Sequence, residues 1–123
     1  MSQPPLGEHA FLVMTALAAQ PQHGYALMED VHESTSGRVR LHAGTLYALL
    51  DRLRTAGLIE IDREETVQSR LRRYYRLTDA GAQRLATESA HLRRLAEAAD
   101  RNLGLAARAR TRRRGPALGG GVA

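Results

Sequence analysis

The chain has no cysteine and no tryptophan among its 123 residues. Without cysteine it can form neither a disulfide framework nor a thiolate metal site, and the reducing cytoplasm is the expected compartment. Long hydrophobic runs are also missing, because the apolar run at residues 10–19 is too short to span a bilayer. Residues 1–6 contain no basic residue of the kind that begins a signal peptide. We therefore expect a soluble cytoplasmic protein with no membrane segment, of a size that suits one compact domain.

Motifs of catalytic chemistry are missing as well. The sequence contains no Gly-rich phosphate loop, no nucleophile elbow and no paired-histidine motif, so we expect no enzymatic activity, no catalytic residues and no cofactor. Glu29, His32 and Glu33 share one face of a predicted helix. Because a zinc site needs three or four convergent ligands, and three polar residues on an exposed helix face are common, we interpret this group as solvated surface.

Basic residues are absent from the first 37 positions, which hold four of the 13 acidic residues. All 18 basic residues, every one an arginine, follow from Arg38 onward together with nine acidic residues. The two parts carry formal charges of −4 and +9, in agreement with the net charge of +5. Such a distribution directs polyanions toward the basic part, although charge alone is also compatible with a solvated surface that binds nothing.

Hydrophobic spacing predicts two helices in the acidic part. Residues 8–19 are apolar at nearly every position, and a helix that is hydrophobic around its whole circumference must be covered on all sides. Because a chain of this size has few other residues with which to cover such a helix, we expect the first helix to contact a second subunit. A second helix is predicted to begin near His23, where the histidine forms helix-start hydrogen bonds. Its buried positions recur at helical spacing and are Gly24, Leu27, Met28 and Val31.

A third helix is predicted over residues 43–56, followed by Gly57 at the position of a left-handed C-cap. Small residues on the face opposite its apolar stripe would let this helix approach the floor of a DNA groove closely. Asp51 lies on that face and is expected to pair with Arg52 or Arg54 rather than to accept from a cytosine amino group. The apolar stripe consists of Leu46, Leu49, Leu50 and Leu53.

Two runs of alternating apolar and polar residues, 58–62 and 71–77, predict a β-hairpin with a polar tip. The returning strand is rich in arginine and contains no acid, whereas the outgoing strand contains Glu64 and Glu65. We expect cross-strand Glu–Arg pairs to hold the hairpin together and the remaining arginines to be free for phosphate. The arginines are Arg70, Arg72, Arg73 and Arg76.

Thr78 is a good N-cap for a last helix, in which apolar residues alternate at spacings of four and three, as in a coiled-coil seam. Beyond Leu105 the chain becomes rich in arginine and then in glycine. This stretch has too little apolar surface to fold, so we expect it to be disordered and to add non-specific electrostatic affinity.

Together these elements predict a mainly α fold with a small β-hairpin wing: a winged helix-turn-helix followed by a C-terminal dimerisation helix. The predicted organisation is an N-terminal arm at 1–7, a DNA-binding domain at 8–78, a dimerisation helix at 79–106 and a disordered tail at 107–123. Because such a domain places one helix in the major groove and its wing on the backbone, the sequence indicates a DNA-binding protein.

Three stretches resemble the PadR-type transcriptional regulators in their short-chain form. They are residues 23–27, residues 44–47 with the leucines and glycine that follow up to Ile59, and residues 73–81, all in the expected order. The resemblance covers roughly residues 8–103. It implies a homodimer of winged-helix subunits that binds a pseudo-palindromic double-stranded operator, usually as a repressor of a neighbouring gene. The sequence departs from the family pattern at His42-Ala43, at Ala48 and at Gln68-Ser69.

The candidate DNA contacts come from two sources. The resemblance assigns Thr45 and Tyr47 to the start of the recognition helix, and Arg72 and Arg73 to the basic wing strand. Position on the outer helical face adds Arg52. The complete set of predicted DNA-binding residues is Thr45, Tyr47, Ala48, Arg52, Arg70, Arg72 and Arg73.

The dimer is predicted to join the first and last helices of two subunits. A hydrophobic small-molecule effector at that interface is compatible with the resemblance, although the lack of tryptophan disfavours an aromatic sandwich around a planar ligand. The alternative is an RNA-binding or protein-interaction winged helix without operator specificity, because Arg-rich segments also suit RNA. The predicted dimer contacts are Phe11, Leu12, Met14, Leu85, Leu92, Leu95, Ala96, Ala99 and Leu103.

Overall fold

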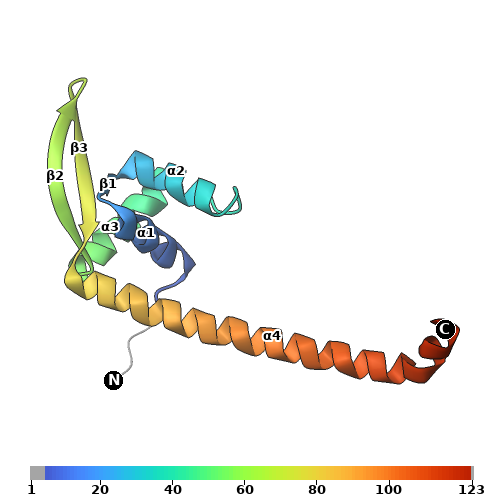
Figure 1. Cartoon of the computed structure of the whole chain (residues 1–123). Helices are drawn as coiled ribbons and strands as arrows, with labels where there is room; N and C mark the ends of the chain where they lie inside the picture. The colour runs from blue at the N-terminus through green and yellow to red at the C-terminus, as the bar shows by residue number, and fades with distance from the viewer. Residues whose placement is uncertain (1–4, 123) are drawn as a thin grey trace. The chain divides into compact units, whose positions relative to one another are not determined.

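The computed structural model describes residues 5–122, without the side chains of 105–107 and 112–122. Its inter-residue contacts divide the chain into two units, residues 1–88 and 89–123, so that the last helix begins in the first unit and continues through the second. The fold is mainly helical with a small antiparallel sheet, which confirms the predicted fold class (Figure 1). The elements in chain order are α1 (Glu8–Ala19), β1 (Gln22–His23), α2 (Gly24–Ser34), α3 (Ala43–Thr55), β2 (Ile59–Val67), β3 (Arg70–Leu77) and α4 (Asp79–Val122).

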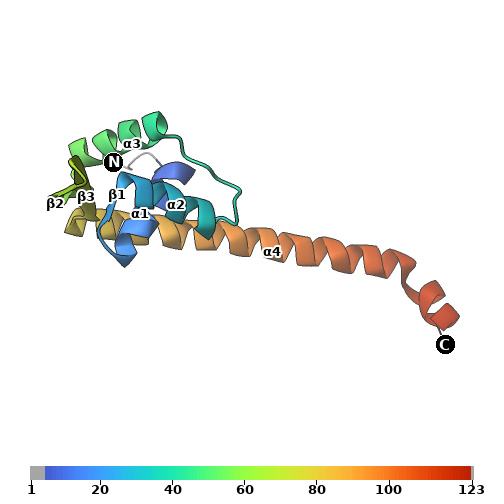
Figure 2. The same cartoon turned by 90° about the horizontal axis from the view of Figure 1, so that it is seen from above.

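The core of the first unit lies where α1, α2 and α3 pack together beside the sheet (Figures 1 and 2). The predicted apolar stripes face this core, and Leu27, Val31, Leu46 and Leu50 have no exposed surface. Burial of a leucine or valine side chain contributes roughly 1.5–3 kcal/mol. The stripe of α3 therefore fixes which of its faces remains available to a ligand.

Helix α1 buries more of its surface within its own subunit than its sequence suggests. Val13 and Met14 are fully buried in the core, and Ala10, Ala16 and Leu17 are nearly so. Met14 therefore has no exposed surface with which to contact a partner, which corrects its assignment to the dimer interface. An apolar helix does not reveal from sequence which face its own domain covers. Phe11 and Leu12 are only partly buried.

The junctions around β2 and β3 follow local rules that the sequence had indicated. Gly57 adopts the left-handed conformation, with φ at 77°, and Leu58 N–H donates to the Leu53 carbonyl at 2.9 Å, as in a Schellman C-cap. Thr78 caps α4, since its hydroxyl oxygen accepts from Gly81 N–H at 3.0 Å. A Cβ on Gly81 would overlap the Leu58 carbonyl oxygen, so only glycine lets α4 begin this close to the α3–β2 turn.

The sheet has the order β1-β3-β2, with both pairings antiparallel. Strand β1 was not predicted, because its two residues gain their strand geometry only by pairing Gln22 with Tyr75 and His23 with Tyr74. The hairpin register contains an irregularity between Ile61 and Arg63, and such bulges increase the twist of a hairpin. At the tip, Gln68 and Ser69 both have positive φ, at 52° and 64°, the pattern of a type I′ turn.

Helix α4 is longer than expected. Its backbone is helical through Val122, whereas the sequence predicted a helix that ends at residue 106 and disorder over 107–123. The alanines and arginines that dominate residues 106–114 are strong helix formers, so the polar composition of that stretch does not by itself stop a helix that is already nucleated. Across the described residues, none of the helices combines the length and apolarity needed to cross a bilayer.

Candidate nucleic-acid interface

A groove of about 650 Å³ lies between the start of α2, the outer face of α3 and the strand β3. Three of the predicted wing contacts and one from the recognition helix meet here. Residues that line the groove are His23, Gly24, Tyr25, Tyr47, Asp51, Arg70, Leu71, Arg72, Arg73 and Tyr75. The structure thus brings together side chains that are far apart in the sequence.

The exposed face of α3 starts with small side chains. Thr45 and Ala48 are exposed beside Tyr47, which keeps 47% of its surface accessible. Gly44 has open space where a Cβ would stand. The N-cap His42 makes no side-chain cap hydrogen bond, and the first turn carries no acidic residue. This end of α3 therefore carries the positive end of the helix dipole without a neutralising carboxylate, which favours an anionic ligand.

The wing arginines divide into paired and unpaired groups. Arg73 Nε donates to Glu64 at 2.9 Å, and Arg76 Nε donates to Glu60 at 2.8 Å, which confirms the expected cross-strand pairing. In the part of the chain that the structure describes, no carboxylate lies within ion-pair distance of Arg70 or Arg72. Arg70 and Arg72 are thus available for a phosphate, whereas Arg73 is already engaged.

Arg72 remains unpaired because the carboxylate opposite it is occupied. Glu65 is the register partner of Arg72, but its carboxylate accepts from Arg63 at 2.9 Å and from the Tyr74 hydroxyl at 3.2 Å. The hydrogen bond from Arg63 is the main cause that lowers the pKa of Glu65. Arg63 also stacks on the Tyr74 ring, 3.8 Å from its centroid. Both oxygens of the Glu65 carboxylate thus accept from residues of the wing other than Arg72.

His23 connects this wing cluster to α2. Its Nδ1 accepts from Ala26 N–H at 3.4 Å, so the histidine caps the helix as predicted, and its ring meets that of Tyr74 edge-on at 5.2 Å. Burial lowers the pKa of His23, the charge of Arg72 lowers it further, and Glu65 opposes the shift. A neutral imidazole is the form that can accept the cap hydrogen bond.

Two residues of α3 lie differently from the expected arrangement, and the DNA contact predicted for Arg52 stays a prediction. Arg52 does not line the groove; it lies in separate hollows with Leu6, Ala10 and Leu49, on the side of α1. Asp51 does line the groove, but among the described residues it forms no ion pair with Arg52 or Arg54.

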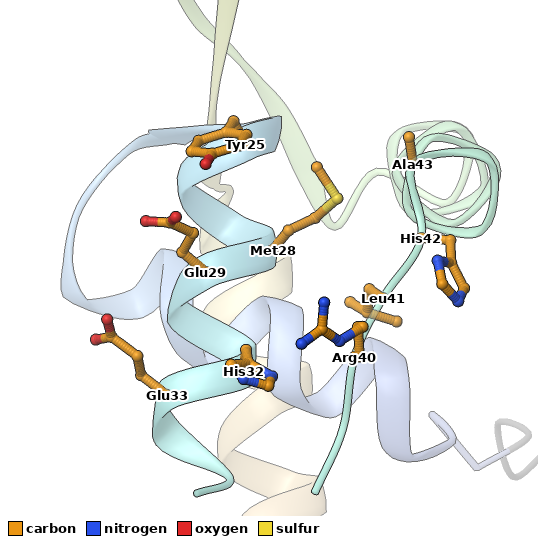
Figure 3. Close-up of a pocket in the computed structure, with 9 residues that line it drawn as sticks. All are labelled: Tyr25, Met28, Glu29, His32, Glu33, Arg40, Leu41, His42 and Ala43. Carbon is orange, nitrogen blue, oxygen red and sulfur yellow. The ribbon is translucent and has the colours of Figure 1, made fainter. Parts of the chain in front are cut away.

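A second hollow, of about 510 Å³, lies between α2 and the segment that leads into α3 (Figure 3). Glu29, His32, Glu33 and Arg40 are among the residues that line it. In Figure 3 the side chains of Glu29 and Glu33 project from one side of α2, whereas His32 projects toward Arg40. Within the described residues, no cluster of three or more His, Asp or Glu side chains could hold a metal ion.

The second unit presents an apolar stripe along α4. Leu92, Leu95 and Leu103 are 39%, 54% and 67% exposed, and Ala96 and Ala99 are exposed beside them. In the first unit, Leu85 is partly buried against the core. Exposed leucines at coiled-coil spacing provide a surface that a partner helix would cover.

Sequence reasoning missed the contribution of α2 to the groove. Gly24 and Tyr25 line it because β1 pairs with β3 and so brings the first turn of α2 against the wing. The alternation of residues 71–77 identified the wing, but no local pattern identified a two-residue strand.

Comparison with known proteins places this architecture in a family. Residues 13–87 match the family model described as the transcriptional regulator PadR-like family. A PadR family regulator from Eggerthella lenta is 31% identical, with a TM-score of 0.64 over 77% of this chain and 83% of that one. A PadR-like transcription factor from Bacteroides fragilis is 28% identical, with a TM-score of 0.64 over 74% of this chain and 85% of that one.

Bacillus subtilis PadR, crystallised with operator DNA, shares the fold at 21% identity and a TM-score of 0.60. The alignment covers 68% of this chain and 47% of that protein, so this chain spans about half the length of Bacillus subtilis PadR. A comparison with curated protein sequences finds no match.

Proposed function

Because the chain belongs to the PadR-like family of DNA-binding transcriptional regulators, we propose that it is a cytoplasmic protein that binds a pseudo-palindromic operator as a homodimer. In this proposal, operator binding represses a neighbouring gene. One observation carries this proposal. Tyr47 of α3 and the unpaired Arg70 and Arg72 of β3 face the same groove. A helix in the major groove and a wing on the adjacent phosphates require this arrangement.

The residues on the two sides of the groove would make different kinds of DNA contact. Arg70 and Arg72 would neutralise phosphates, which positions the protein without reading sequence. Thr45 and Tyr47, with Asp51 next to them, would meet base edges and supply discrimination. The relative crystallised with operator DNA has the same fold, which supports DNA as the ligand.

Dimerisation would bring two recognition helices to one operator. The exposed stripe of α4, with the partly buried Phe11 and Leu12 of α1, provides the apolar surface for a second copy. A hydrophobic small molecule that enters this interface would change the spacing of the two recognition helices and so act as an effector.

Competition binding tests the proposal directly. Duplex DNA that carries an inverted repeat from upstream of the gene is competed with random duplex, and specific binding is expected to be at least about 10³-fold tighter. If about six to ten phosphates are neutralised, affinity should fall about 10³- to 10⁵-fold between roughly 50 and 200 mM salt. A specificity ratio near one would instead favour an RNA-binding or protein-interaction module.

The wing makes a separable contribution. Arg70→Ala and Arg72→Ala are each expected to reduce the slope of log affinity against log salt by about 0.9, because each removes one phosphate contact. Arg76→Ala is the matched control on the same strand, since Arg76 is engaged by Glu60 and Asp62 and should change the slope much less. An unchanged slope in the Arg70 and Arg72 variants would remove the wing from the interface.

A further inference from the structure

Gly24, the first residue of α2, leaves a space that the Tyr47 side chain fills. A Cβ on Gly24 would overlap the Tyr47 hydroxyl and lie 2.8 Å from Cζ and 3.3 Å from Cε1 of the same ring. Gly24 is itself buried. Any side chain at position 24 would therefore displace the ring of Tyr47, which belongs to the next helix.

No conformational requirement explains glycine at this position. Gly24 is helical and is not among the glycines with positive φ, which are Gly7, Gly37 and Gly57. The contact with Tyr47 is thus the physical reason that the structure offers for glycine at position 24.

Gly24 and Tyr47 also line the same groove as the unpaired wing arginines. We propose that Gly24 is a positioning residue for operator recognition, because the space that it leaves holds the hydroxyl end of the Tyr47 ring against the start of α2, in the groove that Arg70 and Arg72 also line. This inference rests on the proposed function, in which Tyr47 contacts the operator. It adds Gly24 of α2 to the residues proposed to determine operator recognition, and Gly24 acts through Tyr47 of α3.

The contact with Gly24 restricts the orientation of the Tyr47 side chain, but it is not needed to hold α3 in place. Helix α3 is anchored by Leu46, Leu49, Leu50 and Leu53, which are buried in the core. With 47% of its surface exposed, Tyr47 has room to rotate to another staggered χ1 when position 24 is filled. A change at Gly24 should therefore alter recognition and leave the fold intact.

The variant Gly24→Ala tests whether the contact between Gly24 and Tyr47 contributes to operator recognition. Operator affinity is expected to fall at least tenfold and the ratio of operator to random-duplex affinity to fall with it, whereas the melting temperature stays close to that of the wild type. Gly104→Ala is the matched control, because Gly104 is also helical and has open space around its Cβ position. It should bind the operator as the wild type does.

A double-variant cycle with Tyr47→Leu shows whether Gly24 acts through the ring. In the Tyr47→Leu background, Gly24→Ala should change operator affinity less than twofold, because the ring that it displaces is gone. A full tenfold loss in that background would overturn the proposal and would mean that Gly24 itself approaches the DNA. Wild-type affinity in Gly24→Ala would overturn it as well.

Tyr47→Phe gives a second measurement that does not depend on the folding of Gly24→Ala. It keeps the ring against Gly24 and removes only the hydroxyl, so operator affinity should fall severalfold while the melting temperature is retained. Unchanged affinity would overturn the proposal, because the hydroxyl is the group that the space at Gly24 holds in the groove. If the wild type itself shows no preference for the operator, the proposed function fails instead, and the two failures are distinguished.

Discussion

His23 joins three parts of the domain through one imidazole ring. It caps α2 through Nδ1, packs against Tyr74 of the wing and lies in the field of Arg72. Its cap function depends on the neutral form, because a protonated Nδ1 has no lone pair to offer the Ala26 N–H. The protonation state of His23 is therefore coupled to folding.

The stability of the domain should fall in mild acid because of this residue. Burial, and then Arg72, place the pKa of His23 in the folded protein below its ordinary value of 6.5. Protons consequently bind more readily to His23 in the unfolded chain than in the folded protein. The stability that neutral His23 contributes is therefore fully present above about pH 6.5, and it is lost as pH falls below that value toward the folded-state pKa. Urea unfolding on either side of this value, at about pH 7.5 and about pH 5.5, measures the loss.

The variant His23→Asn isolates this contribution from the other four histidines, because asparagine is a good N-cap that does not titrate. The wild type should lose more stability than His23→Asn over this pH range. Equal losses in the two proteins would show that protonation of His23 is not linked to folding.

At the scale of the element, the wing tip is strained. Gln68 and Ser69 both have positive φ, in a turn that favours Asn-Gly. The double substitution Gln68→Asn, Ser69→Gly should stabilise the tip by about 1 kcal/mol. Hydrogen exchange at the Val67 and Arg70 amides, which flank the turn, should then slow about fivefold. Gln68→Val should accelerate exchange, and a tip insensitive to both changes would contradict the turn assignment.

Elements with their own local signals could be predicted from the sequence. The Thr78 cap, the Gly57 C-cap and the leucine stripe of α3 appear where spacing and capping rules place them. The arginine-rich strand β3 was likewise recognised from alternation alone. Each of these features depends on residues within one turn or one strand of each other.

Features that depend on tertiary pairing could not be predicted. Strand β1 exists only through β3, and it brings Gly24 and Tyr25 into the groove. The burial of Met14 and the position of Arg52 away from the wing depend on which sides of α1 and α3 face each other. The reason that Arg72 is free and Arg73 is not depends on which arginine engages each glutamate.

At the scale of the whole chain, charge and apolar surface are separated along the sequence. The first 37 residues are acidic, whereas every arginine lies from residue 38 onward. The groove that holds the unpaired arginines belongs to the first unit, and the exposed leucine stripe of α4 belongs to the second. If the chain forms the proposed homodimer through this stripe, DNA contact and self-association should be disrupted independently.

Leu95→Glu tests that separation. A carboxylate at this flank of the stripe would be buried without a partner in the proposed dimer, at a cost of several kcal/mol. The variant should sediment as a monomer at micromolar concentration, and its operator affinity should fall to that of a single half-site while each half-site is still recognised. Arg94→Glu places the same side chain on the other side of the helix and should remain dimeric. A Leu95→Glu protein that still sediments as a dimer would exclude the α4 stripe as the interface.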